Sequence, residues 1–182
     1  MAVTHWMMTN VPGCEVFHCN TGIGIERTRE FVRETCAAMG WPLHEVRAKE
    51  DCGQDYDELV MKHGFPGPDS HSMMYSQLKE RPIRKLVKAA QRKRGDRVLL
   101  ATGIRHEESA RRMRYAGKEV NRVGSQLWVS PIYWWSATER DAYNKAHGLP
   151  VNPVSAMLGM SGECLCGAYA HKGEKSLVKL VC

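Results

Sequence analysis

Two short segments of the chain place glycine beside polar side chains in a pattern that suits an anionic ligand. The candidate ligand-binding residues in them are Asn20, Thr21, Gly22, Ile23, Gly103, Ile104, Arg105 and Arg111. Because glycine has no side chain, the backbone at these turns can come close to a purine. Arg105 offers a forked donor to phosphate or sulfate oxygens, and Arg111 offers a second one.

A plainer explanation of both segments stays open. Glycine also serves turn geometry alone, so Gly22 and Gly103 need not face a ligand. Arg105 could equally form a surface ion pair with Glu107 or Glu108, an interaction of little energetic value.

A second group of cations stands further along, at Lys79, Arg81, Arg84 and Lys85. It either binds an anion or solvates one side of a helix that begins near Pro82. From Lys79 to Arg122 there are fifteen Lys and Arg against five Asp and Glu, a local net charge of +10 in a chain whose total is +6. Such a field attracts nucleotides or nucleic acid, although an exposed basic helix face explains the charge as well.

The thiols form a third candidate group, with seven cysteines in the chain. An odd number without a regular framework favours reduced thiols over a disulfide scaffold. Cys164 and Cys166 are weak metal-ligand candidates, because two thiolates would need Cys14, Cys19 or a histidine to complete a site.

The elements that must position these residues alternate between short apolar runs and helical stretches. We predict strands at 14–19, 43–48, 97–102 and 126–132, and helices at 1–10, 26–39, 55–63, 82–94 and 107–115. Ser136 and Glu139 have the spacing of a capping box that opens one more helix, ending at Gly148. This alternation predicts an α/β protein, an open parallel sheet with helices on both faces.

Length and composition fit a single compact domain. The chain has 182 residues, and we expect one domain, with an α/β core at 1–148 and a loop-rich segment at 149–182. No apolar run reaches the length that crosses a bilayer, so no membrane partner is expected. The amino terminus carries no export signal, which predicts a cytoplasmic protein.

Four segments, taken in order, resemble the phosphoadenosine-phosphosulfate (PAPS) reductase family, within the adenine-nucleotide α-hydrolase-like group. They are Val16–Ile23 with Glu26-x-Thr28-Arg29-Glu30-Phe31, Leu78-Lys79-x-x-Pro82-Ile83, GIRHEESARR from Gly103, and Pro131-Ile132 through Asn152-Pro153 to Ser161-Gly162. The resemblance implies an adenine nucleotide, ATP or PAPS, as ligand. It adds Lys79 and Glu108 to the candidate binding residues.

The sequence also departs from that family. The family's first strand and its Ser-Gly-Gly-x-Asp-Ser phosphate loop are missing, so we expect weak phosphate binding and a sheet edge that a partner chain or a second copy completes. The nucleophilic Glu-Cys-Gly-Leu-His tail is not found. Met73 and Met74 stand where relatives that bind an iron–sulfur cluster have paired cysteines, which argues against such a cluster here.

The resemblance therefore implies a PAPS reductase-like protein of sulfur metabolism that binds an adenine nucleotide or sulfonucleotide. From the departures we expect it to be truncated or inactive as it stands; otherwise the resemblance implies an oxidoreductase or a nucleotidyl- or sulfur-transfer reaction. Two alternatives stay open: a nucleic-acid-modifying sulfur-transfer relative, and a basic module that binds nucleic acid without catalysis. Because Trp134 and Trp135 lie apart from the basic run, we predict that they line the core or a pocket wall rather than stack on bases.

Overall fold

The computed structural model describes residues 1–53, 55–108 and 118–159, together with residues 162, 163, 165, 173 and 179. The chain forms two compact units, each built from two stretches: residues 1–14 with 87–150, and residues 15–86 with 151–182. The prediction of one domain, with a core at 1–148 and a tail at 149–182, stays a prediction. None of the described helices is long and apolar enough to cross a membrane.

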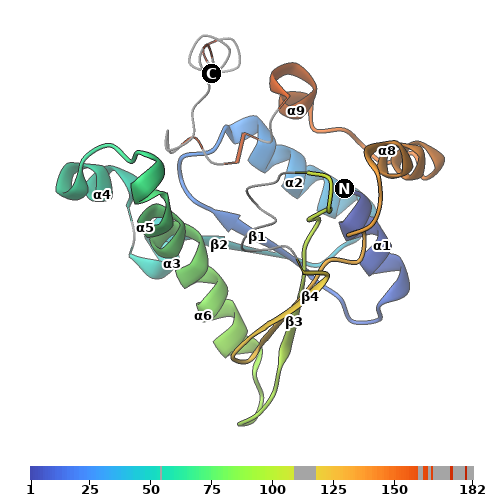
Figure 1. The fold of residues 1–182 in the computed structure, drawn as a ribbon, viewed down its shortest axis with the longest axis horizontal. Coiled ribbons are helices and arrows are strands. Elements are labelled where there is room, and N and C mark those ends of the chain that lie inside the picture. The colour runs from blue at the N-terminus through green and yellow to red at the C-terminus, as the bar shows by residue number, and fades with distance from the viewer. Residues whose placement is uncertain are drawn as a thin grey trace. The chain divides into compact units, whose positions relative to one another are not determined.

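The unit of residues 15–86 and 151–182 contains one parallel strand pair (Figure 1). Its elements are β1 (Val16–Asn20), α2 (Glu26–Met39), β2 (Leu43–Arg47), α3 (Ala48–Cys52), α4 (Tyr56–His63), α5 (His71–Tyr75) and α9 (Pro153–Leu158), with the start of α6 (Arg81–Ala90). β1 and β2 pair in parallel from Val16 opposite Leu43 to Asn20 opposite Arg47. Helix α2 connects them, which makes the predicted βαβ arrangement.

Local sequence explains where α2 begins and ends. Glu26 lies in its first turn, where a carboxylate favours the positive end of the helix dipole. Gly40 follows the helix with φ of 65°, a left-handed conformation, and its amide closes the last turn on the carbonyls of Cys36 and Ala37. The predicted helix at 26–39 is confirmed at both ends.

A longer helical stretch spans residues 68–90. A 3₁₀ turn, η1 (Pro68–Ser70), leads into α5, which continues through a π-helical segment, η2 (Ser76–Glu80), into α6. Ala48, Met74 and Leu78 form a buried cluster there. Buried apolar side chains of this kind hold α3, α5 and η2 together.

The predicted helix at 82–94 ends earlier than expected, at Ala90. The side chain of Asp96 accepts hydrogen bonds from the amides of Arg92 and Lys93, both at 3.0 Å. The side chain of Asp96 therefore takes the place of the helix carbonyls to which these amides would otherwise donate, and the helix stops.

The unit of residues 1–14 and 87–150 contains a three-stranded mixed sheet in the order β3-β5-β4. Its elements are α1 (Ala2–Asn10), β3 (Val98–Ala101), β4 (Val120–Val123), β5 (Gln126–Val129) and α8 (Ala137–Ala146). β3 pairs with β5 in parallel, as the α/β class requires. Strand β4 was not predicted, and it pairs with β5 antiparallel.

The antiparallel pair follows from its turn. Val123 lies opposite Gln126, so only Gly124 and Ser125 connect the two strands. Gly124 has φ of 60°, which a two-residue hairpin turn requires. The α/β class with parallel strands and helices is confirmed, and β4 is an addition to it.

Helices α1 and α8 contact each other in the same unit. His5 Nδ1 lies 2.8 Å from the Tyr143 hydroxyl, and the ring of His147 lies 4.7 Å from that of His5. Ser136 and Glu139 form the predicted capping box at the start of α8, with the Glu139 amide 3.2 Å from Ser136 Oγ. The predicted helix at 107–115 lies mostly outside the described residues.

Candidate functional site

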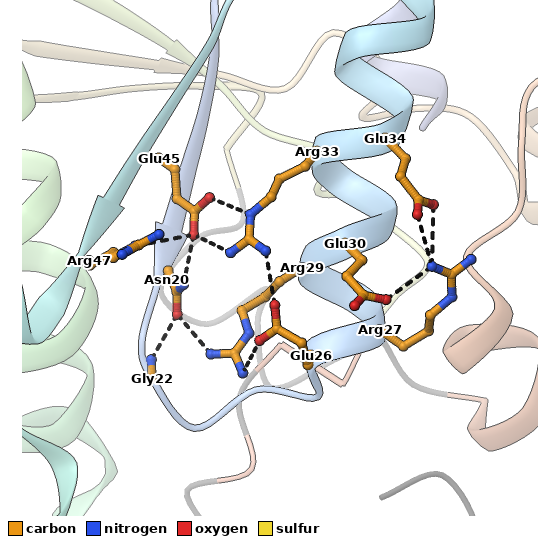
Figure 2. A network of polar contacts seen from close by, with 10 residues as sticks. All are labelled: Asn20, Gly22, Glu26, Arg27, Arg29, Glu30, Arg33, Glu34, Glu45 and Arg47. Carbon is orange, nitrogen blue, oxygen red and sulfur yellow. Dashed lines mark hydrogen bonds and ion pairs between the residues drawn. The ribbon is translucent and has the colours of Figure 1, made fainter.

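The turn after β1 is organised by the side chain of Asn20. Its Oδ1 accepts hydrogen bonds from the amide of Gly22 at 3.0 Å and from Arg29 Nη1 at 3.1 Å, while its Nδ2 donates to Glu45 Oε1 at 2.7 Å (Figure 2). Gly22 has φ of 81°, and a Cβ there would meet no atom within 4 Å. In this conformation, Asn20 and Gly22 shape the turn.

An ion-pair network supports that turn from α2 and β2. Arg33 donates to both oxygens of Glu45, at 2.8 and 2.9 Å, and to Glu26 at 2.9 Å (Figure 2). The hydrogen bonds from Arg33 lower the pKa of Glu45 to about 2, so this carboxylate is ionised at neutral pH. A two-pronged contact between a guanidinium and a carboxylate fixes geometry as well as charge.

A distant segment closes over the same turn. The carbonyl of Glu163 accepts a hydrogen bond from Thr21 Oγ1 at 3.2 Å, and that of Gly162 accepts one from the amide of Ile25 at 2.8 Å. The carboxylate of Glu163 lies 3.0 Å from Nε2 of His18, a side chain buried on β1. We call Gly162 and Glu163 the strap.

Two glycines let the strap lie this close. A Cβ on Gly24 would come within 2.8 Å of the Glu163 carbonyl oxygen, and one on Gly162 within 2.9 Å of a Val154 methyl group. Asn152, which caps α9 through the amide of Val154, also donates to Thr28 Oγ1 at 3.2 Å. The strap and α9 are thus held on the first turn of α2.

Lys79 lies in the π-helical segment η2, near the half-buried thiol of Cys19. Cys19 Sγ donates to the carbonyl of Leu78 at 3.2 Å. Burial raises the pKa of the Cys19 thiol to about 11, and the nearby charge of Lys79 opposes this rise only in part. Cys19 is therefore protonated at neutral pH and unsuited to nucleophilic attack. A π-segment inside a helix often marks a functional position.

The turn after β3 buries a guanidinium. Arg105 is 5% exposed, and its Nη1 donates to the carbonyl of Trp135 at 3.3 Å. Its Nη2 lies 3.9 Å from Glu108 Oε1, beyond hydrogen-bond distance, and among the described residues its Nε has no hydrogen-bond partner. Arg105 therefore forms the long ion pair with Glu108 that the alternative named, but as a buried side chain and not on the surface.

The other candidate residues pack against neighbouring elements or lie outside the described residues. Gly103 lies against α1, where a Cβ would come within 3.3 Å of a Val3 methyl group. Ile23 packs against the cluster around Met74, and Ile104 is half-buried. Arg111, Cys164 and Cys166 lie outside the described residues. Within the described part, no group of three or more His, Cys, Asp or Glu side chains could hold a metal ion.

Sequence reasoning missed the partners that hold these turns. His18 and Glu163 meet across 145 positions of the sequence, so no local pattern could reveal them. Arg33 was missed although it shares α2 with Glu26, because ion pairs on a helix are usually solvent-exposed and uninformative. The two turns lie in different compact units, so the expectation that Thr21 and Arg105 meet one ligand stays a prediction.

These features define an α/β protein with polar turns at the carboxyl ends of parallel strands. Comparison with known proteins gives the family. The sequence model of one protein family, the phosphoadenosine phosphosulfate reductase domain, matches residues 1–156. The chain belongs to the phosphoadenosine phosphosulfate reductase domain family.

Two relatives illustrate the match. An adenosine 5′-phosphosulfate reductase of Burkholderia cepacia is 25% identical over 181 residues, which cover 97% of this chain and 68% of that protein. The crystal structure of a phosphoadenylyl-sulfate reductase from Candida auris, a phosphate complex, shares the fold with a TM-score of 0.61. It has 18% sequence identity, over 85% of this chain and 71% of the other.

Proposed function

We propose that this protein binds an adenine sulfonucleotide and acts in sulfur metabolism, with Arg105 meeting the anionic group of the ligand. The family supports this proposal, because the relatives are named reductases of adenosine 5′-phosphosulfate and of phosphoadenylyl sulfate. The position of Arg105 supports it as well, since ligands of open parallel sheets bind beyond the carboxyl ends of the strands.

The observation that carries the proposal is the burial of Arg105 with an unused donor. A guanidinium cannot lose its charge in a protein, and a charge taken out of water needs compensation. Among the described residues its guanidinium hydrogen-bonds to one backbone carbonyl, its Nε has no hydrogen-bond partner, and the carboxylate of Glu108 lies 3.9 Å away, too far for a hydrogen bond. A sulfate or phosphate group supplies the missing acceptors in the planar geometry that a guanidinium prefers.

A contact between Arg105 and the sulfate or phosphate group would assist a reaction at that group as well as binding. A cation fixed where charge develops on a sulfuryl or phosphoryl group stabilises that charge without reorganisation. The thiol that a reduction requires is not Cys19, whose pKa burial raises to about 11. The proposal therefore concerns the nucleotide and leaves the reaction open.

Substitution of Arg105 tests the proposal. We expect the wild-type protein to bind adenosine 5′-phosphosulfate, and Arg105→Ala to weaken binding roughly 10- to 100-fold, the loss of charged hydrogen bonds. Arg105→Lys should fall between the two, because it keeps the charge and loses the fork. Calorimetric titration measures the affinities, and ligand-dependent melting confirms that the variants fold.

Arg140→Ala is the matched control, since this partly exposed arginine of the same unit pairs only with its neighbour Asp141 among the described residues. It should bind the nucleotide as tightly as the wild type. Equal affinity of Arg105→Ala and the wild type would remove Arg105 from the site.

Nucleic-acid binding is the second candidate function, and a specific observation favours it. The turn after α6 exposes Arg92, Lys93, Arg94 and Arg97. Among the described residues, no carboxylate forms an ion pair with these four side chains within 4 Å, whereas Arg84 pairs with Glu80 at 2.6 Å. Unpaired exposed cations of this kind are what a phosphate backbone recruits.

A further inference from the structure

The loop after β5 carries an exposed indole whose orientation is fixed. Trp134 is 68% exposed, so the expectation that it lines the core is wrong, and the alternative of a pocket wall stays a prediction. Its ring stacks on that of His106 at 5.4 Å and 29°, and meets Tyr133 edge-to-face at 4.8 Å. Its Nε1 donates to Glu119 Oε2 at 3.3 Å.

This degree of order distinguishes Trp134 from an ordinary exposed apolar residue. A single hydrophobic side chain on a surface needs no explanation, but it normally samples several rotamers. Here two rings and a carboxylate hold the indole in one orientation. The ring is thus organised in advance of any ligand, which lowers the entropic cost of stacking on it.

The indole belongs to the same pair of loops as Arg105. β3 and β5 are parallel neighbours, so the segments that follow Ala101 and Val129 leave the sheet at the same edge. The two segments are tied together where the amide of His106 donates to the Tyr133 carbonyl at 2.8 Å, next to the bond from Arg105 to the Trp135 carbonyl. The aromatic ring and the buried guanidinium therefore occupy neighbouring positions on one loop pair.

We infer that Trp134 is the stacking platform for a nucleobase. The inference rests on the proposed function, which supplies a ligand that has a base at one end and an anionic group at the other. An indole face recognises any planar heterocycle, and base–aromatic stacking tolerates every base. The base can come from a free nucleotide or from a nucleotide within a single strand of nucleic acid.

Three variants test the platform. Trp134→Ala removes the ring, Trp134→Phe keeps a smaller one, and His106→Ala removes the ring beneath it. Phe65→Ala is the matched control, because Phe65 is a 79% exposed aromatic residue in the other compact unit. The probes are adenosine 5′-phosphosulfate, inorganic sulfate, and a single-stranded oligodeoxyadenylate compared with an abasic strand of equal length.

We expect Trp134→Ala to bind adenosine 5′-phosphosulfate about 5- to 100-fold more weakly, the usual loss of one base stack. Trp134→Phe should lose less than about fivefold, and His106→Ala should lie between them. The affinity for inorganic sulfate should be the same in all variants, because sulfate has no base. Phe65→Ala should match the wild type.

Fluorescence gives an independent readout. A base stacked on an exposed indole quenches its emission. The wild type should therefore lose emission on titration with adenosine 5′-phosphosulfate, whereas Trp134→Phe should bind the nucleotide with little quenching. A merely structural role of Trp134 predicts the same quenching in both proteins.

The outcomes separate the two proposals. If the nucleotide binds but Trp134→Ala binds it as tightly as the wild type, the platform is overturned and the proposed function stands. If only the oligodeoxyadenylate binds, more tightly than the abasic strand and through Trp134, the platform stands and the sulfonucleotide proposal falls. If the wild type binds no probe that contains a base, both are wrong.

Discussion

Glu45 shows how single residues fix the turn after β1. Its side chain, 15% exposed, accepts from Arg33 and Asn20, and Asn20 in turn holds the amide of Gly22. Loss of one partner would leave the carboxylate with fewer donors in a poorly solvated position. The turn therefore depends on Arg33 and Glu45, which lie outside it on α2 and β2.

The first prediction concerns the pH dependence of this pair. Hydrogen bonds from Arg33 lower the pKa of Glu45 from its ordinary 4.5 to about 2. Stability from this carboxylate is thus present above about pH 4.5 and is lost as pH falls towards 2. Arg33→Gln should lower the free energy of unfolding by about 1–2 kcal/mol at pH 7, discounted for the partly exposed guanidinium, and by less at pH 3.

Urea unfolding at pH 7, 5 and 3 measures this effect. Arg27→Gln is the control, because Arg27 lies on the same helix and pairs with Glu30 and Glu34 on its exposed side. It should change stability little at any pH. A constant difference between Arg33→Gln and the wild type from pH 7 to pH 3 would contradict the prediction.

Single residues also mark the limit of what the sequence predicts. The polar turns at Asn20 and Arg105 follow strands that short apolar runs indicate, so both turns could be found. Whether Arg105 was buried, and Trp134 exposed, depends on neighbours such as Trp135 and His106 that meet only in the folded protein. Residue type predicts chemistry, whereas burial requires the fold.

At the scale of elements, the strap is held against the turn after β1 by backbone contacts. It carries hydrogen bonds to Thr21 and Ile25 and lies against Gly24, a glycine without a left-handed φ. The need for glycine at position 24 therefore comes from space rather than from backbone conformation. This distinction can be measured.

Gly24→Ala tests the contact between the strap and α2. A Cβ within 2.8 Å of the Glu163 carbonyl oxygen forces backbone to move, so we expect a loss of about 1–3 kcal/mol in the free energy of unfolding. The amide of Ile25, which donates to Gly162, should also lose protection from hydrogen exchange.

Gly67→Ala is the control for this substitution, because a Cβ there meets no atom within 4 Å and its φ is not left-handed. It should change stability by less than about 0.5 kcal/mol. A Gly24→Ala protein that is as stable as Gly67→Ala would show that the strap lies farther from α2 in solution.

Elements with strong local signals were predicted well, and those with long-range causes were not. The capping box of α8 and the end of α2 at Gly40 are each determined by a few residues that are close in sequence. Strand β4 contains Asn121 and Arg122 side by side, so its sequence lacks an apolar run that would predict a strand. Its pairing with β5 makes it a strand. Helix α9 had a usable signal, since Asn152 caps it and Pro153 takes its first turn.

At the scale of the whole molecule, charge is the feature most open to solution tests. The chain carries a net charge of +6, with the local +10 between Lys79 and Arg122. Some of these cations are engaged, as Arg84 is with Glu80, whereas the turn after α6 exposes several without such a partner among the described residues. A long-range field of this sign affects association with polyanions more than it affects the fold.

We predict salt-dependent binding of single-stranded DNA through that turn. Affinity should fall steeply between 50 and 200 mM salt, and the triple variant Arg92→Gln, Lys93→Gln, Arg94→Gln should reduce the salt slope by about 2. Fluorescence anisotropy with a labelled strand measures both values. Equal slopes for the triple variant and the wild type would assign the binding to other cations.

The construction of each compact unit from two separate stretches also has a consequence for folding. Residues 1–14 must wait for residues 87–150, and the turn after β1 must wait for the strap at 162–163. During synthesis, α1 and the turn after β1 therefore leave the ribosome long before these partners exist, whereas β1 finds its partner strand β2 soon after it. Contacts between such distant positions slow folding, so the nascent chain should depend on chaperones until residues 162–163 have emerged.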